Sequence, residues 1–304
     1  MLSGCQSGVT ESAMLFRKVA IIGVGLIGGS LGAAIKARRL AERVAGIGHR
    51  VESLEQALKL GQIDEFTLNA PAGVAGADLV VIATPVRLIA EKAREIAGSL
   101  APHCIVTDVG STKGAVAKQL DLLLTGKARY VGSHPMAGSD KRGAENAAEG
   151  LFAGALCILT PTPQTDLDAQ HRIGELWRAV GARTATMAPD EHDRRVALAS
   201  HLLHVSAACL VNVQTSGSLE CAASGFADTT RIAGSDARLW RDICLDNAAE
   251  IVAAIDKFRD ELASIRMLIE QGDDRKLFEK LDCAARKRHE WKGPPGHRGP
   301  GGAS

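Results

Sequence analysis

Short runs of β-branched and aliphatic residues alternate with segments of helical periodicity along the first 188 residues of the chain. The β-branched runs predict buried strands at 18–23, 43–47, 77–83, 104–108, 130–133 and 156–160. Apolar residues at helical spacing predict helices at 30–39, 53–60, 87–100 and 113–124. Strands and helices that alternate at this interval build parallel sheets through right-handed crossovers. The pattern therefore predicts an α/β fold with a doubly wound sheet.

The pattern changes near residue 188, and no run after Pro189 predicts a strand. Residues 190–215 predict one long helix, and residues 236–271 predict one or two more. A layer of helices this thin leaves apolar positions that a second subunit can cover. We therefore expect an α/β domain over 15–188, an all-α dimerisation and substrate domain over 189–290, and a homodimer.

The two ends of the chain differ from the rest in composition. Residues 1–14 are expected to form a flexible extension, and Met14 is an alternative start to Met1. Residues 291–304 are rich in glycine and proline, which predicts a disordered tail.

Composition and charge exclude several classes of function. Lys+Arg 36 balances Asp+Glu 35 to a net charge of +1, which gives no overall attraction to nucleic acid or to an anionic membrane. No apolar run reaches the ~18–20 residues that span a bilayer. The 7 cysteines form no CxxC pair, which argues against a zinc site or a disulfide framework. We therefore expect a cytoplasmic protein that acts on a small molecule.

A glycine-rich motif, Gly23-Val24-Gly25-Leu26-Ile27-Gly28, directly follows the first predicted strand and opens a helix. In this GxGxxG pattern Gly23 makes the tight turn, Gly25 lets the backbone approach a pyrophosphate, and Gly28 lets the helix pack closely on the strand. The free N–H groups at the helix start, around Leu26 and Ile27, bind phosphate. The motif in this setting predicts a Rossmann-type domain that binds NAD or NADP.

The end of the second predicted strand bears on which dinucleotide binds. NAD sites usually have a carboxylate there for the ribose 2′-hydroxyl. This chain has none at 47–50, and Arg50, with His49, can pair with a 2′-phosphate. We therefore expect NADP to be favoured over NAD. Thr84 and Pro85 end the third strand, at the edge where such sheets bind their ligands.

Several further motifs, in order along the chain, resemble those of the prephenate/arogenate dehydrogenase family of tyrosine biosynthesis. They are DVGSTKG at 108–114, YVGSHPMAGS at 130–139, EHD at 191–193, SHLLH at 200–204, FADTTRIA at 226–233 and LWRDI at 239–243. The resemblance runs from about Val19 to about Ile269. It implies oxidative decarboxylation of prephenate to 4-hydroxyphenylpyruvate, or of arogenate to tyrosine, with NAD(P)+ and without a metal.

The resemblance also implies roles for individual residues. His134 matches the catalytic histidine, which accepts the proton of the substrate hydroxyl. Ser111 would hydrogen-bond this hydroxyl, and Asp193 would orient His134 and stabilise its cationic form. His204 matches a second active-site histidine, and Arg231 would hold a substrate carboxylate through its planar fork.

Spacing along the predicted helix at 190–215 supports part of this grouping. Asp193, Ser200 and His204 are spaced i, i+7 and i+11, which places them on one face of a regular α-helix. We expect His201 to be structural rather than catalytic, and Trp240 to belong to the core.

Two departures from the family pattern leave the substrate open. Leu203 stands where proline is usual, and Ala227 where arginine or lysine is common, so Arg231 must hold the substrate carboxylate with less help. Asp190 suits the ammonium of arogenate, but acidic residues there also occur in users of prephenate.

Two other functions share part of this pattern. A β-hydroxyacid dehydrogenase shares the architecture but normally has a lysine on the first long helix of its second domain, and 190–215 contains none. A dinucleotide sensor without turnover would not need His134, Asp193, His204 and Arg231 together.

Overall fold

The computed structural model describes residues 14–138, 141, 143–291 and 293, and it divides the chain into two compact units between Pro189 and Asp190. Each unit is described by itself below. The predicted flexible extension at 1–14 and the predicted disordered tail at 291–304 lie almost wholly outside the described residues.

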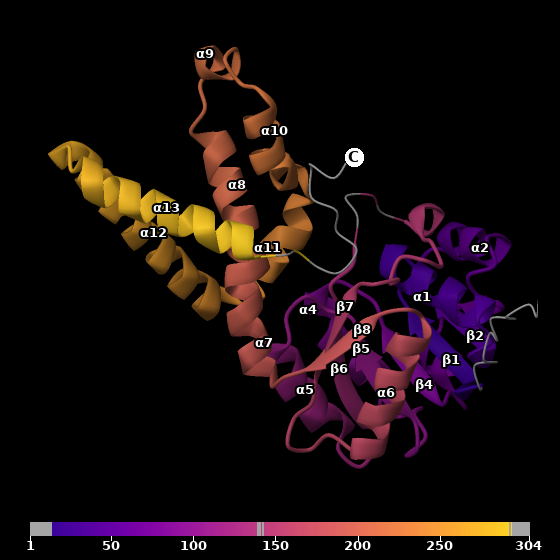
Figure 1. Ribbon diagram of the computed structural model, residues 1–304. Helices are drawn as coiled ribbons and strands as arrows, with labels where there is room; N and C mark the ends of the chain where they lie inside the picture. Colours follow the sequence, from indigo (N-terminus) through magenta and orange to yellow (C-terminus); the bar gives the residue numbers. More distant parts are fainter. Residues whose placement is uncertain (1–13, 139–140, 142, 292, 294–304) are drawn as a thin grey trace, which may run out of the picture. The chain divides into compact units, whose positions relative to one another are not determined.

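Unit 1 is built on an eight-stranded sheet in the order β3-β2-β1-β4-β5-β6-β7-β8 (Figure 1). The strands are β1 (Phe16–Ile22), β2 (Ala41–Ile47), β3 (Glu65–Thr67), β4 (Leu79–Ile82), β5 (Ile105–Asp108), β6 (Arg129–Pro135), β7 (Leu156–Thr160) and β8 (Arg183–Thr186). The order reverses between β1 and β4, which are neighbours. Open α/β sheets bind their ligands at such a switch point.

The helices of unit 1 cover both faces of the sheet. They are α1 (Leu26–Ala37), α2 (Val51–Lys59), α3 (Ala70–Val74), α4 (Val86–Ile96), α5 (Gly114–Leu124) and α6 (Leu167–Ala179). One apolar cluster combines residues of α1, α2 and α6 with Val19 and Ile21 of β1, and the other combines α3, α4 and α5 with Ala20 and Ile22. Successive side chains of a strand point to opposite faces, so a continuous apolar run such as β1 supplies both cores.

One pairing in the sheet departs from the expected parallel pattern. β7 runs antiparallel to β6, with His134 opposite Ile158, whereas the other neighbouring strands pair in parallel. A crossover helix is required only between parallel strands. The connection from β6 to β7 contains the three-residue 3₁₀ helix η1 (Ala144–Asn146) in place of such a helix.

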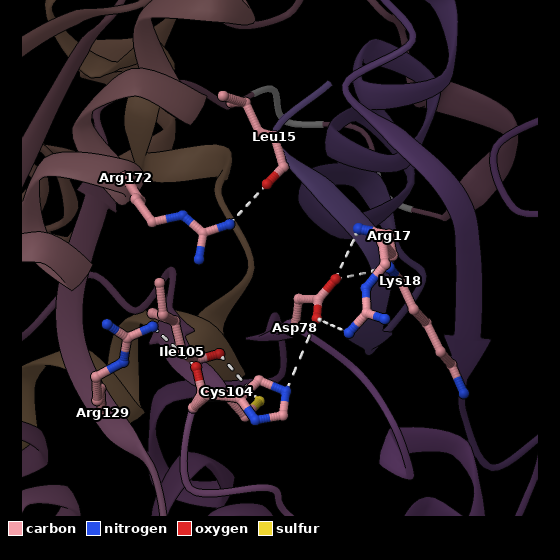
Figure 2. A network of polar contacts seen from close by, with 9 residues as sticks. Leu15, Arg17, Lys18, Asp78, Cys104, Ile105, Arg129 and Arg172 are labelled. Atoms are coloured by element: carbon pink, nitrogen blue, oxygen red, sulfur yellow. Dashed lines mark hydrogen bonds and ion pairs between the residues drawn. The ribbon is translucent and has the colours of Figure 1, made fainter. Parts of the chain in front are cut away.

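A polar network lies where β1, β4 and β5 begin, at the amino ends of these strands (Figure 2). The carboxylate of Asp78 accepts hydrogen bonds from the main-chain N–H groups of Arg17 and Lys18, at 2.6 and 3.3 Å, and from the Arg17 guanidinium at 3.2 Å. Burial raises the pKa of Asp78, but these hydrogen bonds outweigh it and the pKa lies below its ordinary value.

Unit 2 contains helices and, among its described residues, no strand. They are α7 (Pro189–Val196), the π-helical segment η2 (Ala197–His201), α8 (Leu202–Asn212), α9 (Ser216–Leu219), α10 (Ser224–Thr230), the 3₁₀ helix η3 (Arg231–Gly234), α11 (Ala237–Asp246), α12 (Ala248–Gln271) and α13 (Asp274–Glu290). Gly272 ends α12 in the left-handed conformation, with φ +62°, and the chain turns there into α13 (Figure 1). Lys280 of α13 pairs with Glu261 of α12 at 3.0 Å.

The structure confirms the expected fold class, an α/β doubly wound sheet followed by an all-α region, and adds elements that the pattern did not predict. The missed strands are β3 and β8, and the missed helices include α6 and α13. β3 has only 3 residues and β8 has no fully buried residue, so neither shows an apolar run. In the part of the chain that the structure describes, no helix is long and apolar enough to cross a membrane.

Candidate active site

The glycine-rich turn lies between β1 and α1 and has the geometry of a phosphate cradle. Gly23 has φ +97°, and a Cβ on it would lie 2.6 Å from the carbonyl oxygen of Ala83. A Cβ on Gly28 would lie 2.1 Å from the Gly23 carbonyl oxygen, so both positions exclude a side chain. A Cβ on Gly25 would meet nothing within 4 Å. Gly25 thus borders open space beside the first residues of α1, Leu26 and Ile27, as close approach of a pyrophosphate requires.

Thr84 lies next to this cradle, because β4 neighbours β1. The main-chain N–H of Ala83 donates to the carbonyl of Ile22 at 2.7 Å. The hydroxyl of Thr84 is buried and has no hydrogen-bond partner among the described residues, and Pro85 directly precedes α4. A buried hydroxyl is seldom left unpaired, so this one is available to a bound ligand. The glycine cradle and this hydroxyl together fit a dinucleotide.

His49 and Arg50 lie in the turn between β2 and α2, and both side chains are exposed. β2 is the neighbour of β1 on the side opposite β4. The turn contains no carboxylate, as the sequence indicates. The geometry leaves both side chains accessible to a ribose phosphate and does not by itself distinguish NADP from NAD.

The loop that carries Ser111 is anchored by a buried polar cluster. Asp108, at the end of β5, accepts hydrogen bonds from the main-chain N–H of Gly110 and from the Tyr130 hydroxyl, each at 2.8 Å, and forms an ion pair with Lys113. Burial raises the pKa of Tyr130, and the adjacent Asp108 raises it further, so Tyr130 remains a hydrogen-bond donor. Buried charges persist when they are paired and hydrogen-bonded. Ser111 is half-buried on a loop that this cluster holds in place.

His134 lies near the end of β6, and its side chain is largely buried. The preceding residue, Ser133, shares a hydrogen bond of 2.5 Å with Thr107 of β5. Asp108 pairs with Gly132, so the serine loop follows β5 while His134 lies near the end of the neighbouring strand β6. The structure therefore brings together the predicted residues Ser111 and His134 at the end of the sheet that also carries Gly23 and Thr84.

Asp193 lies in unit 2, on α7, and its carboxylate contacts the neighbouring residue of the EHD motif, to which no role was assigned. Its Oδ1 lies 2.8 Å from Nδ1 of the fully buried His192. Asp193 and His134 belong to different units, so its predicted role beside His134 stays a prediction.

The helical spacing argument for Asp193, Ser200 and His204 is wrong. Residues 197–201 form the π-helical segment η2, which advances less per residue than an α-helix. The segment therefore shifts the register of all residues that follow it. Ala197 and His201 are the buried residues of this segment, whereas Ser200 is half-buried. α8 continues through Leu203, which stands where proline is usual in the family.

His204 stacks on the indole of Trp240, with ring centroids 3.5 Å apart and an interplanar angle of 21°. Burial lowers the pKa of His204; a hydrogen bond with the Ile232 carbonyl raises it, and the charge of Arg231 lowers it. The net effect is a lowered pKa, so His204 is neutral near pH 7. Its Nδ1 is buried and has no hydrogen-bond partner among the described residues.

Arg231 and Trp240 complete this part of the helical unit. The Arg231 side chain is exposed and has no ion-pair partner within the described residues. Trp240 is half-buried and stacked on His204 rather than enclosed in a core, so its assignment to the core is wrong. A guanidinium beside a neutral imidazole and an indole suits a ring-bearing carboxylate.

The sequence analysis missed four residues that shape these sites: Lys113, Tyr130, His192 and Asn247. Three of the four stand in the quoted motifs: Lys113 in DVGSTKG, Tyr130 at the first residue of YVGSHPMAGS and His192 in EHD. Their burial was the missing information, because a lysine is almost never fully buried unless it is paired. No group of side chains in the described part of the chain has the composition of a metal site.

Comparisons with known proteins agree over nearly the whole chain. The family model "Prephenate dehydrogenase, nucleotide-binding domain" matches residues 31–186, and "Prephenate dehydrogenase, dimerization domain" matches residues 188–283. Prephenate dehydrogenase of Bacillus subtilis is 41% identical over 274 residues, which is 88% of this chain and 74% of that protein. Cyclohexadienyl dehydrogenase of Zymomonas mobilis is 34% identical over 283 residues, 90% of this chain and 96% of that protein. The crystal structure of prephenate dehydrogenase from Aquifex aeolicus with hydroxyphenyl propionate and NAD+ superposes with a TM-score of 0.86 at 33% identity, covering 92% of this chain and 99% of that one.

Proposed function

The chain belongs to the prephenate/arogenate dehydrogenase family, and from this membership we propose which residues perform the reaction, which dinucleotide is preferred and how the chain assembles. Its activity is NAD(P)-dependent prephenate/arogenate dehydrogenation in tyrosine biosynthesis. This membership removes the β-hydroxyacid alternative. The observation that carries the residue assignment is that Ser111 lies on the loop that follows β5, and His134 lies near the end of the neighbouring strand β6, at the ends of the strands that bear the dinucleotide cradle.

The substrate loses a hydride, a proton and CO2. When bound, the dinucleotide accepts the hydride from the carbon that carries the ring hydroxyl. His134 accepts the hydroxyl proton as a general base, and Ser111 donates or accepts a hydrogen bond at the same oxygen. The carbonyl formed in this way accepts the electron pair of the breaking C–CO2 bond, and the ring becomes aromatic. The proton held by His134 is then available to the product phenol oxygen.

Arg231 and His204 are proposed to bind the substrate. The exposed guanidinium binds a carboxylate, and the neutral imidazole of His204 lies beside it, stacked on Trp240. Both substrates carry carboxylates, and they differ in a keto-acid or amino-acid side chain. The proposal covers prephenate and arogenate, and the assay below decides between them.

NADP is the proposed preferred dinucleotide. Support comes from the exposed His49 and Arg50 and from the absence of a carboxylate in residues 47–50, which form the end of β2 and the following turn. A carboxylate there would bind a ribose hydroxyl and repel a 2′-phosphate. The Aquifex aeolicus structure contains NAD+, so NAD is the alternative that the assay must test.

The assay measures NAD(P)H formation at ~340 nm with prephenate or arogenate and with NAD or NADP, in a two-by-two grid. Turnover identifies the substrate and the dinucleotide together. His134→Asn should lower kcat by about 10²–10⁴, the usual contribution of a general base, while the dinucleotide still binds. Inactivity in all four wells, with binding retained, would instead favour a dinucleotide sensor. An active His134→Asn enzyme would refute the assignment of the base.

A homodimer is the proposed assembly. The family model over residues 188–283 is a dimerisation domain. Large apolar side chains of α12 and α13 are exposed in the single chain, as expected when a second copy covers them.

A further inference from the structure

A buried carboxamide at the corner between α11 and α12 has no part in the reaction proposed above. Asn247 directly follows α11 and directly precedes α12, and only 5% of it is exposed. Its main chain already continues the helical hydrogen bonds, since its N–H donates to Ile243 at 3.0 Å and its carbonyl accepts from Ile251 at 3.1 Å. The side chain of Asn247 does not cap α12, and its amide makes separate contacts.

The side-chain amide of Asn247 joins two segments of the first long helix of unit 2. Its Nδ2 donates to the main-chain carbonyl of Asp193 at 2.9 Å and lies 3.3 Å from Nδ1 of His201. A carbonyl can only accept, so the nitrogen rather than the oxygen of the amide faces Asp193. The second N–H of the same nitrogen then points to His201, and Nδ1 of His201 must accept it. The proton of the neutral ring consequently resides on Nε2.

The His201 ring in turn contacts Trp240 edge to face, with centroids 5.9 Å apart and an interplanar angle of 75°. Trp240 stacks on His204 at 3.5 Å. A continuous series of contacts therefore leads from Asn247 through His201 and Trp240 to His204, which was assigned above to the substrate.

We propose that Asn247 is a positioning residue of the dehydrogenase: its amide fixes the tautomer and orientation of His201, and thereby places Trp240 and His204 for the substrate. The proposal rests on the assignment of His204 to the substrate. Asn247 acts through these rings and does not contact the substrate itself.

The charges around His201 agree with a neutral acceptor ring. Burial lowers the pKa of His201 to about 4; Asp193 raises it, and His192 and His204 lower it. These groups come from α7 and α8, while Trp240 of α11 and Asn247 itself carry no charge. His201 therefore stays neutral over the pH range in which the enzyme is assayed.

Asn247→Asp tests the proposal with almost no change in size. A carboxylate only accepts, so it can bridge to His201 only if Nδ1 carries a proton. Ring-nitrogen NMR, with His201→Gln to assign the signal, should find the proton of native His201 on Nε2. In Asn247→Asp the proton should appear on Nδ1, or the ring should become cationic near neutral pH. We expect kcat to fall about tenfold or more and its acid limb to move to higher pH, with the KM for the dinucleotide within twofold of native.

Asn212→Asp is the matched control, because Asn212 is exposed at the end of α8 and undergoes the same chemical change. It should leave kcat, its pH profile and the His201 signal unchanged. Asn247→Ser retains one hydrogen-bond donor and should have a higher kcat than Asn247→Asp. It also provides a second variant if Asn247→Asp does not fold.

Two results would overturn the proposal: a proton on Nδ1 of native His201, or a native kcat and pH profile in Asn247→Asp. A native enzyme inactive on both substrates would instead overturn the proposed function, and the ring-nitrogen signals would still report whether Asn247 sets the tautomer.

Discussion

Two histidine rings of the helical unit, His201 and His204, are kept neutral by burial. His201 is 1% exposed and His204 stacks on an indole, and burial lowers the pKa of both rings. A histidine that is buried neutral must gain a proton when the protein unfolds in acid. The burial of these two rings, which belong to the proposed substrate region, therefore makes stability depend on pH.

Acidification should destabilise the protein between pH 6.5 and 4. The pKa of His201 is about 4 in the folded chain and has an ordinary value of 6.5 in an unfolded one, so the unfolded chain binds more protons in this window. The free energy of unfolding therefore falls as the pH falls, by at most about 3 kcal/mol from this residue. Urea unfolding at several pH values measures the slope. His201→Gln should reduce it, whereas the exposed His171→Gln should not; equal slopes in all three proteins would contradict the prediction.

Arg50 should determine the preference for NADP. A charged hydrogen bond to a 2′-phosphate contributes about 1.5–3 kcal/mol. Arg50→Ala should therefore raise the KM for NADP about tenfold or more and leave the KM for NAD within twofold. Arg43→Ala, at an exposed arginine on the preceding strand β2, is the control. A native enzyme that prefers NAD, or an Arg50→Ala enzyme with an unchanged KM for NADP, would disprove this role.

At the scale of elements, polar groups stabilise the sheet at both ends of its strands. Asp108 and its partners hold the loop after β5, beside the proposed active site. Asp78 joins the starts of β1 and β4 at the other ends of the strands (Figure 2). Asp108 and Asp78 have different roles, because only the carboxyl ends of the strands, where Asp108 lies, carry the glycine cradle and the serine loop.

Asp78→Ala should lower the free energy of unfolding without affecting turnover. The main-chain N–H of Arg17 would lose its 2.6 Å acceptor, and an unpaired, partly buried donor costs about 1–3 kcal/mol. Chemical denaturation measures the loss, and kcat should remain within twofold of native. Asp78→Asn keeps one acceptor oxygen and should lose less. Unchanged stability of Asp78→Ala would show that water replaces the carboxylate.

At the scale of the whole molecule, the two units differ in how many apolar side chains they bury. Unit 2 has a small buried cluster around Ala197, Ile251 and Ala254, whereas the sheet of unit 1 has two extensive ones. Phe258, Leu262 and Ile269 are exposed and lie on one face of α12, because their spacing of i, i+4 and i+11 returns to the same side of the helix.

The chain should form a dimer through this helical unit. Light scattering should give the mass of two chains, and Leu262→Lys combined with Ile269→Lys should shift the mass toward one chain. The control is Leu122→Lys, at a position in unit 1 that is 82% exposed, which should leave the dimer intact. A double variant that remains dimeric would exclude this face of α12 as part of the interface.

The sequence by itself determined the alternation of strands and helices, the glycine motif and the resemblance that led to the family. These features are readable because each depends on residues close together in the chain: Gly23, Gly25 and Gly28 act within one strand–turn–helix. Residues that matched a motif could be assigned for the same reason.

Only the tertiary structure decided which polar groups pair across long separations. Asn247 and His201 are 46 residues apart, and Arg17 and Asp78 are 61 apart. The π-helical segment also changed the register that a regular helix predicts. Such contacts depend on packing between elements, which the local pattern of apolar and polar residues does not specify, and so the sequence could not show that His201 faces Asn247 or that Trp240 faces His204.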